Sequence, residues 1–180
     1  MPISEVYNCD CLEYMRSLPD KHFDLCIADP PYGINASNMT MGSGKNKRWS
    51  KGKRWDACAP TPEIFAEIFR VSKEQIIWGG NYFTLPLSKD WIVWDKLNPN
   101  LSFAEGELAW CSIGRNLRIF KHYSVGGEVR IHPTQKPVAL YAWLLDNYAM
   151  GGVKSSTRFW GVVHHELPPT KRDMTFTLAS

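Results

Sequence analysis

The sequence contains no long apolar run. None of its hydrophobic stretches approaches the roughly 18 residues that a membrane-spanning helix requires. Its first residues, MPISEVYNCD, lack the basic and apolar regions of a secretory signal. We therefore expect a cytoplasmic protein without a membrane partner.

Paired cysteine spacings are also absent. The chain has five cysteines and no C-x-x-C pair of the kind that zinc sites use; they are Cys9, Cys11, Cys26, Cys58 and Cys111. We expect reduced, mostly buried thiols and no metal site. The stretch GSGK, from Gly42 to Lys45, is not a phosphate-binding loop, because the preceding glycine is at the wrong spacing and Asn46 replaces the required Ser or Thr.

A strong overall charge is absent as well, since the formal net charge is +3. Positive residues instead gather within about 36–56, a stretch rich in Gly, Ser, Asn and Lys that predicts a loop. Its basic side chains are Lys45, Lys47, Arg48, Lys51, Lys53 and Arg54. A solvated charged loop and a clamp for DNA phosphates are both open interpretations.

The apolar pattern of the 180 residues predicts one α/β domain. FDLCIAD, residues 23–29, is apolar without alternation, which is typical of a strand covered on both faces. Other strands are expected in SEVYN, QIIWGG and DWIVWD, and a hairpin around Gly114 is expected between ELAWCSIG and NLRIFKHY. Helices are expected in DCLEYMRSL, in TPEIFAEIFRVS with Thr61 as its cap, and in KPVALYAWLLDNYAM.

The stretch CIADPPYGI places a stiff turn directly after the apolar strand. Pro30 and Pro31 restrict the backbone, so the Asp29 carboxylate and the carbonyls of Asp29 and Pro30 point in fixed directions. Such acceptors suit an amino group on a flat ring, and Tyr32 offers a face for stacking. The pieces match a nucleobase extruded from a duplex. The alternative is that the turn simply ends a strand.

Three stretches carry a family resemblance: NCDCLEYMRSLPDKHFDLCIADPPYGI, WGGNYF and RIHPTQKPVALYAWLL. Together they resemble bacterial and phage DNA amino-methyltransferases in which the catalytic motif precedes the cofactor motif. The likeness runs from about Val6 to Met150. Within this family, a motif that begins with Asp is more similar to adenine-specific than to cytosine-specific enzymes.

The resemblance implies a Rossmann-like sheet and transfer of a methyl group from S-adenosylmethionine to the amino nitrogen of adenine in double-stranded DNA. Asp29 and the Pro30 carbonyl would hold the amino hydrogens, and Tyr32 would stack the base. Asp10, Asp29 and Lys136 would lie beside the cofactor. Asp10 has a second interpretation as a helix cap. His132 is interpreted as a turn residue before a proline.

After residue 152 the chain departs from the family. The resemblance implies a further strand with a Gly-rich cofactor turn, whereas residues 153–180 form a divergent tail. When synonymous codons are assigned to residues 154–170 and each codon is started one base earlier, the resulting frame can encode ILDTLLGSGSS. We therefore predict a frameshift in the coding DNA. We also expect the methyltransferase domain, 1–152, to have an incomplete sheet with an exposed apolar edge, and the tail to pack poorly.

Three functional alternatives stay open at this point. The same acceptors would serve an amino-methyltransferase acting on cytosine or on RNA. A chain without a cofactor turn would instead be a non-catalytic DNA-binding remnant that retains the basic loop.

Overall fold

The computed structural model describes residues 4–36, 56–98, 104–123, 135–149, 159–164 and 174–179. Within them the helices are α1 (Cys11–Arg16), α2 (Pro62–Val71), α3 (Val138–Tyr148) and the short 3-10 helix η2 (Gly80–Tyr82). The strands are β1 (Ser4–Cys9), β2 (Phe23–Asp29), β3 (Ser72–Trp78), β4 (Trp91–Asp95), β5 (Gly106–Cys111), β6 (Arg118–Lys121), β7 (Phe159–His164) and β8 (Met174–Ala179).

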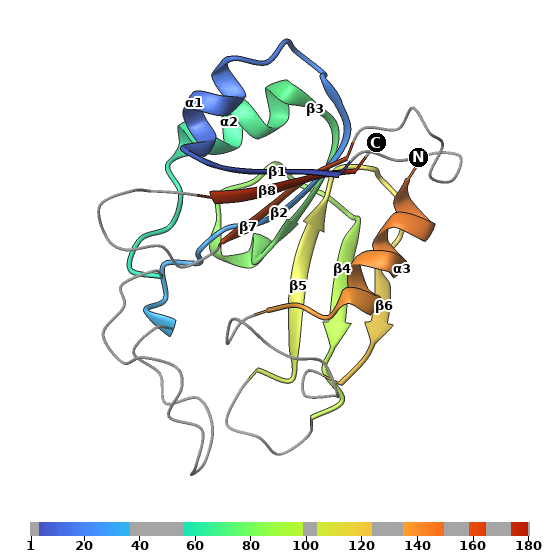
Figure 1. Cartoon of the computed structure of the whole chain (residues 1–180). Coiled ribbons are helices and arrows are strands. Elements are labelled where there is room, and N and C mark those ends of the chain that lie inside the picture. The colour runs from blue at the N-terminus through green and yellow to red at the C-terminus, as the bar shows by residue number, and fades with distance from the viewer. Residues whose placement is uncertain are drawn as a thin grey trace.

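These strands form one open, mixed sheet in the order β1-β8-β7-β2-β3-β5-β4-β6 (Figure 1). β2 pairs in parallel with β3 on one side and with β7 on the other. β5 and β8 run antiparallel to their neighbours. The carboxyl ends of β2, β3 and β7 therefore share one edge of the sheet, where α/β proteins commonly bind their ligands.

β2 is buried on both faces, which explains why its sequence is apolar without alternation. Cys26 and Ala28 pack with residues of α1 and α2. Leu25 and Ile27 point the other way and pack with α3. Figure 1 shows the corresponding arrangement, with α1 beside α2 and with α3 on its own against β4 to β6. The prediction of an α/β fold with a doubly covered strand is confirmed.

The helix boundaries follow local chemistry. Asp10 caps α1, because its Oδ1 accepts hydrogen bonds from the backbone N–H groups of Leu12 and Glu13 at 2.8 and 3.1 Å. Pro62 begins α2 as predicted, but the side chain of Thr61 makes no capping bond. None of the helices within the described ranges has the length and apolar character needed to cross a bilayer.

The predicted hairpin around Gly114 is wrong. β5 and β6 do not pair, because β4 lies between them. Both edges of β5 are already used, one by β3 and the other by β4. The connection between β5 and β6 passes the start of β4. There the buried Asp90 accepts a hydrogen bond from the backbone N–H of Arg115 at 2.9 Å. β6 then runs parallel to β4.

The expected apolar edge beside β2 is also wrong. β7 pairs along β2 from Leu25, opposite Phe159, to Asp29, opposite Val163. β8 then joins β7 to β1. The central position beside β2 is therefore filled by a strand from residues 153–180. The physical reason is that an open strand edge leaves backbone N–H and C=O groups unpaired. The backbone of the segment FWGVVH forms hydrogen bonds with these groups of β2.

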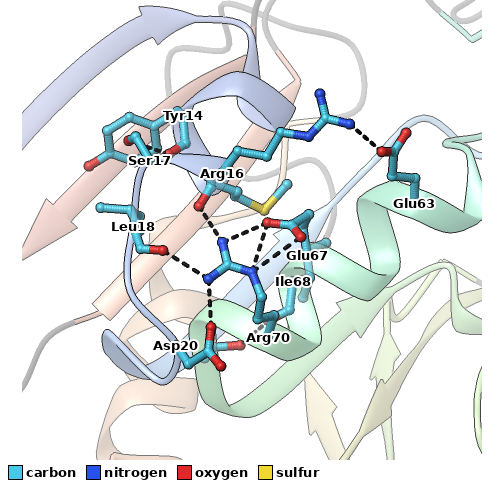
Figure 2. Close-up of polar contacts among 11 residues, drawn as sticks. Tyr14, Arg16, Ser17, Leu18, Asp20, Glu63, Glu67, Ile68 and Arg70 are labelled. Carbon is cyan, nitrogen blue, oxygen red and sulfur yellow. Dashed lines mark hydrogen bonds and ion pairs between the residues drawn. The ribbon is translucent and has the colours of Figure 1, made fainter.

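Hydrogen bonds of the Arg70 side chain connect α2 to the segment that follows α1 (Figure 2). Its Nη1 donates to the Leu18 carbonyl at 2.8 Å and to Asp20 at 2.7 Å. Its Nη2 donates to the Met15 carbonyl and to Glu67, both at 2.7 Å. Nε also donates to Glu67, at 3.0 Å. A planar guanidinium can satisfy four acceptors at once, which a lysine ammonium cannot.

We expect Arg70→Lys to lower the midpoint of thermal unfolding by several degrees, because the fork of hydrogen bonds is lost. The matched control is Arg16→Lys, since Arg16 forms an ion pair with Glu63 in which both side chains are 55% exposed. Exposed pairs contribute little, so the control midpoint should stay within about a degree of the parent. Equal midpoints for all three proteins would contradict a stabilising role for the Arg70 contacts.

Candidate functional site at the carboxyl end of β2

The fold brings three charged side chains to the α3 side of the sheet. Asp29 ends β2 and shares the face of Leu25 and Ile27. Glu107, near the start of β5, is two residues from Ala109 and therefore shares its face of the sheet. Because β5 runs antiparallel to β3, its start lies at the edge where β3 ends. Lys136 lies two residues before α3 begins. The three side chains therefore converge beyond the carboxyl end of β2.

Lys136 is the centre of this cluster. Its Nζ lies 2.5 Å from Asp29 Oδ1, 3.2 Å from Glu107 Oε2 and 3.3 Å from the Tyr32 hydroxyl. Only 2% of the Lys136 side chain is exposed. An ammonium group has three N–H donors, so all of them have acceptors within the protein. The ammonium also lies 5.2 Å above the ring of Trp78, a favourable cation–π position.

Glu107 joins a second lysine to the cluster. Its Oε1 lies 2.7 Å from Lys96 Nζ, while Oε2 faces Lys136. Burial alone would raise the pKa of Glu107, but the two ammonium groups outweigh it and lower the pKa to about 2. Glu107 is therefore ionised throughout the physiological range. The formal charges of Lys96, Glu107, Lys136 and Asp29 sum to zero.

Asp29 behaves differently from Glu107. Burial raises its pKa above the ordinary value, and the nearby charge of Glu107 adds to this rise, although Lys136 opposes it. Asp29 and Glu107 differ because Glu107 has two cationic neighbours, whereas Asp29 has only Lys136. Tyr32 donates its hydroxyl to Asp29 Oδ1 at 3.1 Å. Burial and the Asp29 charge raise the pKa of Tyr32, so its hydroxyl stays protonated and can donate.

The Tyr32 ring is enclosed by the segment that follows β3. It stacks on Tyr82 with centroids 5.1 Å apart and planes 18° from parallel, and it meets Phe83 edge-on. Gly79 has a φ of +69°, and a Cβ added there would lie 2.3 Å from Tyr32 Cε1. A side chain at position 79 would therefore displace the ring.

Asp56 fixes the turn that carries Tyr32. Its side chain accepts hydrogen bonds from the backbone N–H groups of Gly33 at 2.8 Å and Ala36 at 2.9 Å. Asp56 is only 1% exposed. Together with the prolines, this buried carboxylate sets the path of the chain after β2.

The predicted site residues have different outcomes. The side chains of Asp29, Tyr32 and Lys136 contact one another. Pro30, which follows Asp29 in the sequence, is buried. Asp10 is the helix cap described above. Strands β8 and β7 separate β1 from β2, which places Asp10 roughly 14 Å from Asp29 across the sheet. The six basic residues from Lys45 to Arg54, and His132, lie outside the described residues.

Sequence reasoning missed Glu107, Lys96, Asp56 and Tyr82. Glu107 could have been found, because ELAWC opens with an acid on the face shared by Ala109 and Cys111. Asp56 and Lys96 lie far from β2 in sequence, and only the fold brings them near it. Within the described ranges, no group of three His, Cys, Asp or Glu side chains is arranged to hold a metal ion.

The residues assigned to S-adenosylmethionine fit it unequally. This cofactor presents ribose hydroxyls and a sulfonium cation, which carboxylates can bind. Asp10 uses Oδ1 to cap α1, so its second oxygen suits a ribose hydroxyl. The described contacts of Asp29 also use Oδ1, and the charge of this carboxylate suits a neighbouring sulfonium without a hydrogen bond to it. Lys136 would lie beside the cofactor without donating to it, because Asp29, Glu107 and Tyr32 already accept its three hydrogens.

We expect Gly79→Ala to lower the free energy of unfolding by about 2–4 kcal/mol, since it combines a left-handed φ with a clash against the Tyr32 ring. Gly114→Ala is the matched control, because Gly114 has a φ of +80° and nothing within 4 Å of an added Cβ. The control should lose only about 1 kcal/mol. Equal losses in urea denaturation would show that the ring contact is unimportant.

Glu107 should make the protein sensitive to acid. A folded pKa of about 2, against an ordinary 4.5, gives stability that is fully present above pH 4.5 and is lost as the pH falls toward 2. We expect the parent to lose roughly 3 kcal/mol more stability over this range than Glu107→Gln. The exposed Glu105 provides the control, and Glu105→Gln should follow the parent. Parallel pH curves for Glu107→Gln and the parent would contradict this account.

Comparison with known protein families does not identify the chain. No family model matches it. Its function is therefore inferred from the geometry of the site and from the motifs that form it.

Proposed function

We propose that the chain is an S-adenosylmethionine-dependent amino-methyltransferase of Rossmann-like type that acts on adenine in double-stranded DNA. The observation that carries this proposal is the buried Lys136 bridge, which fixes Asp29 at the end of a parallel strand and beside a Pro-Pro turn. An open sheet with helices on both faces is compatible with such a fold.

The proposed chemistry depends on how Asp29 is held. Lys136 and Tyr32 both bind Oδ1, so Oδ2 and the Pro30 carbonyl are the acceptors for the two amino hydrogens of the base. This contact directs the nitrogen lone pair toward the methyl donor. S-adenosylmethionine, when bound, supplies a methyl group activated as a sulfonium. The amino nitrogen loses one proton as it gains the methyl group, and Asp29, whose pKa is raised by burial, would accept this proton.

The substrate must leave the duplex to reach this site. Extruding a nucleotide costs a few kcal/mol, which aromatic stacking partly offsets. The basic stretch from Lys45 to Arg54 supports DNA as the substrate, because each phosphate that it neutralises strengthens binding at low salt. Cytosine carries a similar amino group, so the acceptors alone do not distinguish the two bases.

A second candidate is a DNA-binding protein without catalytic activity. The observation that favours it is the full use of the Lys136 donors inside the protein, which leaves no hydrogen of this lysine for a hydrogen bond to the cofactor. Titration calorimetry with S-adenosylmethionine separates the two candidates. Salt-sensitive DNA binding without heat from the cofactor would favour the non-catalytic protein.

We expect Asp29→Asn to lower methyl transfer to DNA by roughly 100-fold or more, because the amide lacks the charge that Lys136 orients. Transfer is measured with radiolabelled S-adenosylmethionine, and digestion of the product identifies the methylated base. Asp24→Asn is the matched control, since Asp24 is on the same strand and pairs with Lys73 at 2.7 Å. Equal loss in both variants, or methylated cytosine or RNA as the product, would overturn the assignment.

A further inference from the structure

Strands β5, β4 and β6 carry an apolar row on the face of the sheet opposite α3. The strand register places Leu108 beside Val93, and Val93 beside Ile119. Their chain neighbours Ile92 and Ala109 belong to the core under α3, and side chains alternate along a strand, so the row points away from α3. Leu108 is 37% exposed and Ile119 is 54% exposed. The row is therefore open to solvent.

The helices on this side of the sheet cover other strands. α1 and α2 pack on β2 and β3, against side chains such as Cys26 and Ile77. Figure 1 shows both helices away from β4 and β6. Of the described helices, only α3 packs on β4 and β6, and it does so on the opposite face. Leu117, which immediately precedes β6, is 53% exposed and widens the apolar surface. Adjoining apolar side chains of this kind mark an interaction surface, whereas single exposed ones do not.

The next row on the same face is charged. Asp95 of β4 is the register partner of Lys121 of β6, two residues beyond the pair of Val93 and Ile119. Asp95 is half-buried and Lys121 is exposed. Two neighbouring strands thus carry the same order of side chains, apolar and then charged, but their charges have opposite signs.

This pattern makes the face complementary to itself. Consider a second copy related by a half-turn about an axis that runs along the strands, between β4 and β6. Its β6 would lie over β4, and its β4 over β6. Val93 would then meet the second copy's Ile119, and Asp95 would meet the second copy's Lys121. No like charges of this row would face each other.

We propose that this face, formed by Leu108, Val93, Ile119, Asp95 and Lys121, joins two copies of the chain in a symmetric dimer. A twofold contact repeats each interaction, so every apolar contact and ion pair occurs twice. Sheets that pack face to face lie about 10 Å apart, which leaves room for one layer of side chains from each sheet. The apolar row supplies the affinity, and the charges fix the orientation.

The dimer is independent of the proposed function. Asp29 and Glu107 lie on the α3 face, whereas the dimer would use the opposite face. Its test therefore needs neither cofactor nor methyl transfer. Failure of the dimer would leave the proposed function intact, and failure of methyl transfer would leave the dimer intact.

The dimer can be tested by sedimentation equilibrium with the full chain over a range of concentrations. We expect the mass of two chains at high concentration and of one chain on dilution. Ile119→Lys should weaken association by at least about tenfold, because it places a charge in the apolar row. Leu87→Lys is the matched control, since Leu87 is fully exposed outside the three strands. It makes the same change of charge and should match the parent.

Exchange of the two charges tests the orientation of the copies. Lys121→Asp and Asp95→Lys should each weaken association, because each places like charges opposite one another. An equal mixture of the two variants should regain the dimer, since every contact then joins opposite charges. Asp95 Oδ1 also accepts a hydrogen bond from the Leu97 N–H at 2.9 Å, but mixing would not repair damage within one chain. Circular dichroism checks that each variant is folded.

Three results would overturn the dimer. They are a parent with the mass of one chain at every concentration, a two-chain mass that persists in Ile119→Lys, and a mixture of the charge variants that does not associate. Binding to a fluorescent DNA duplex is measured in parallel. A single-chain parent that loses DNA affinity in Lys121→Asp would assign this face to DNA instead.

Discussion

The candidate site depends on one interaction, the contact of the Lys136 ammonium with Asp29, Glu107 and Tyr32. It connects the end of β2, the start of β5 and the segment that leads into α3. Each of these elements is positioned by apolar packing on the α3 face, where Ile27, Ala109 and Leu140 belong to one core. The core brings the charges together, and the buried ammonium then fixes the direction of each acceptor. The Asp29 carboxylate is consequently oriented before any ligand arrives.

The neighbouring aromatic residues connect this buried charge cluster to the protein surface. Tyr32 is held by the same ammonium and carboxylates, and it in turn supports the exposed Tyr82. Gly79 permits this close packing because it has no side chain. Exposure to solvent therefore increases from the buried charge cluster around Lys136 to the exposed ring of Tyr82.

Much of the fold follows from local patterns in the sequence. The limits of β2 match its apolar run, and α2 begins at Pro62, because these features depend on burial and backbone restriction that the local residues determine. The pairing of β5, β4 and β6 did not follow, since it is decided by competition for strand edges across the whole sheet. In the site, Asp29 and Tyr32 were evident from the turn. For Glu107, alternation in ELAWC indicates the face it shares with Ala109, but the partners it meets there depend on which strand lies beside which.

The charge cluster is better explained by the proposed function than by stability. Removing charges from water is expensive, and replacing a buried ion pair by well-packed apolar residues is often neutral or stabilising. The rest of the α3 face shows that this sequence can supply such residues, for example Ile27, Trp78 and Leu144. Against this background, two lysines and two carboxylates at the carboxyl edge of the central strands contribute little that a hydrophobic contact could not. What they add is an oriented acceptor with a defined charge, which the proposed recognition of an amino group would require.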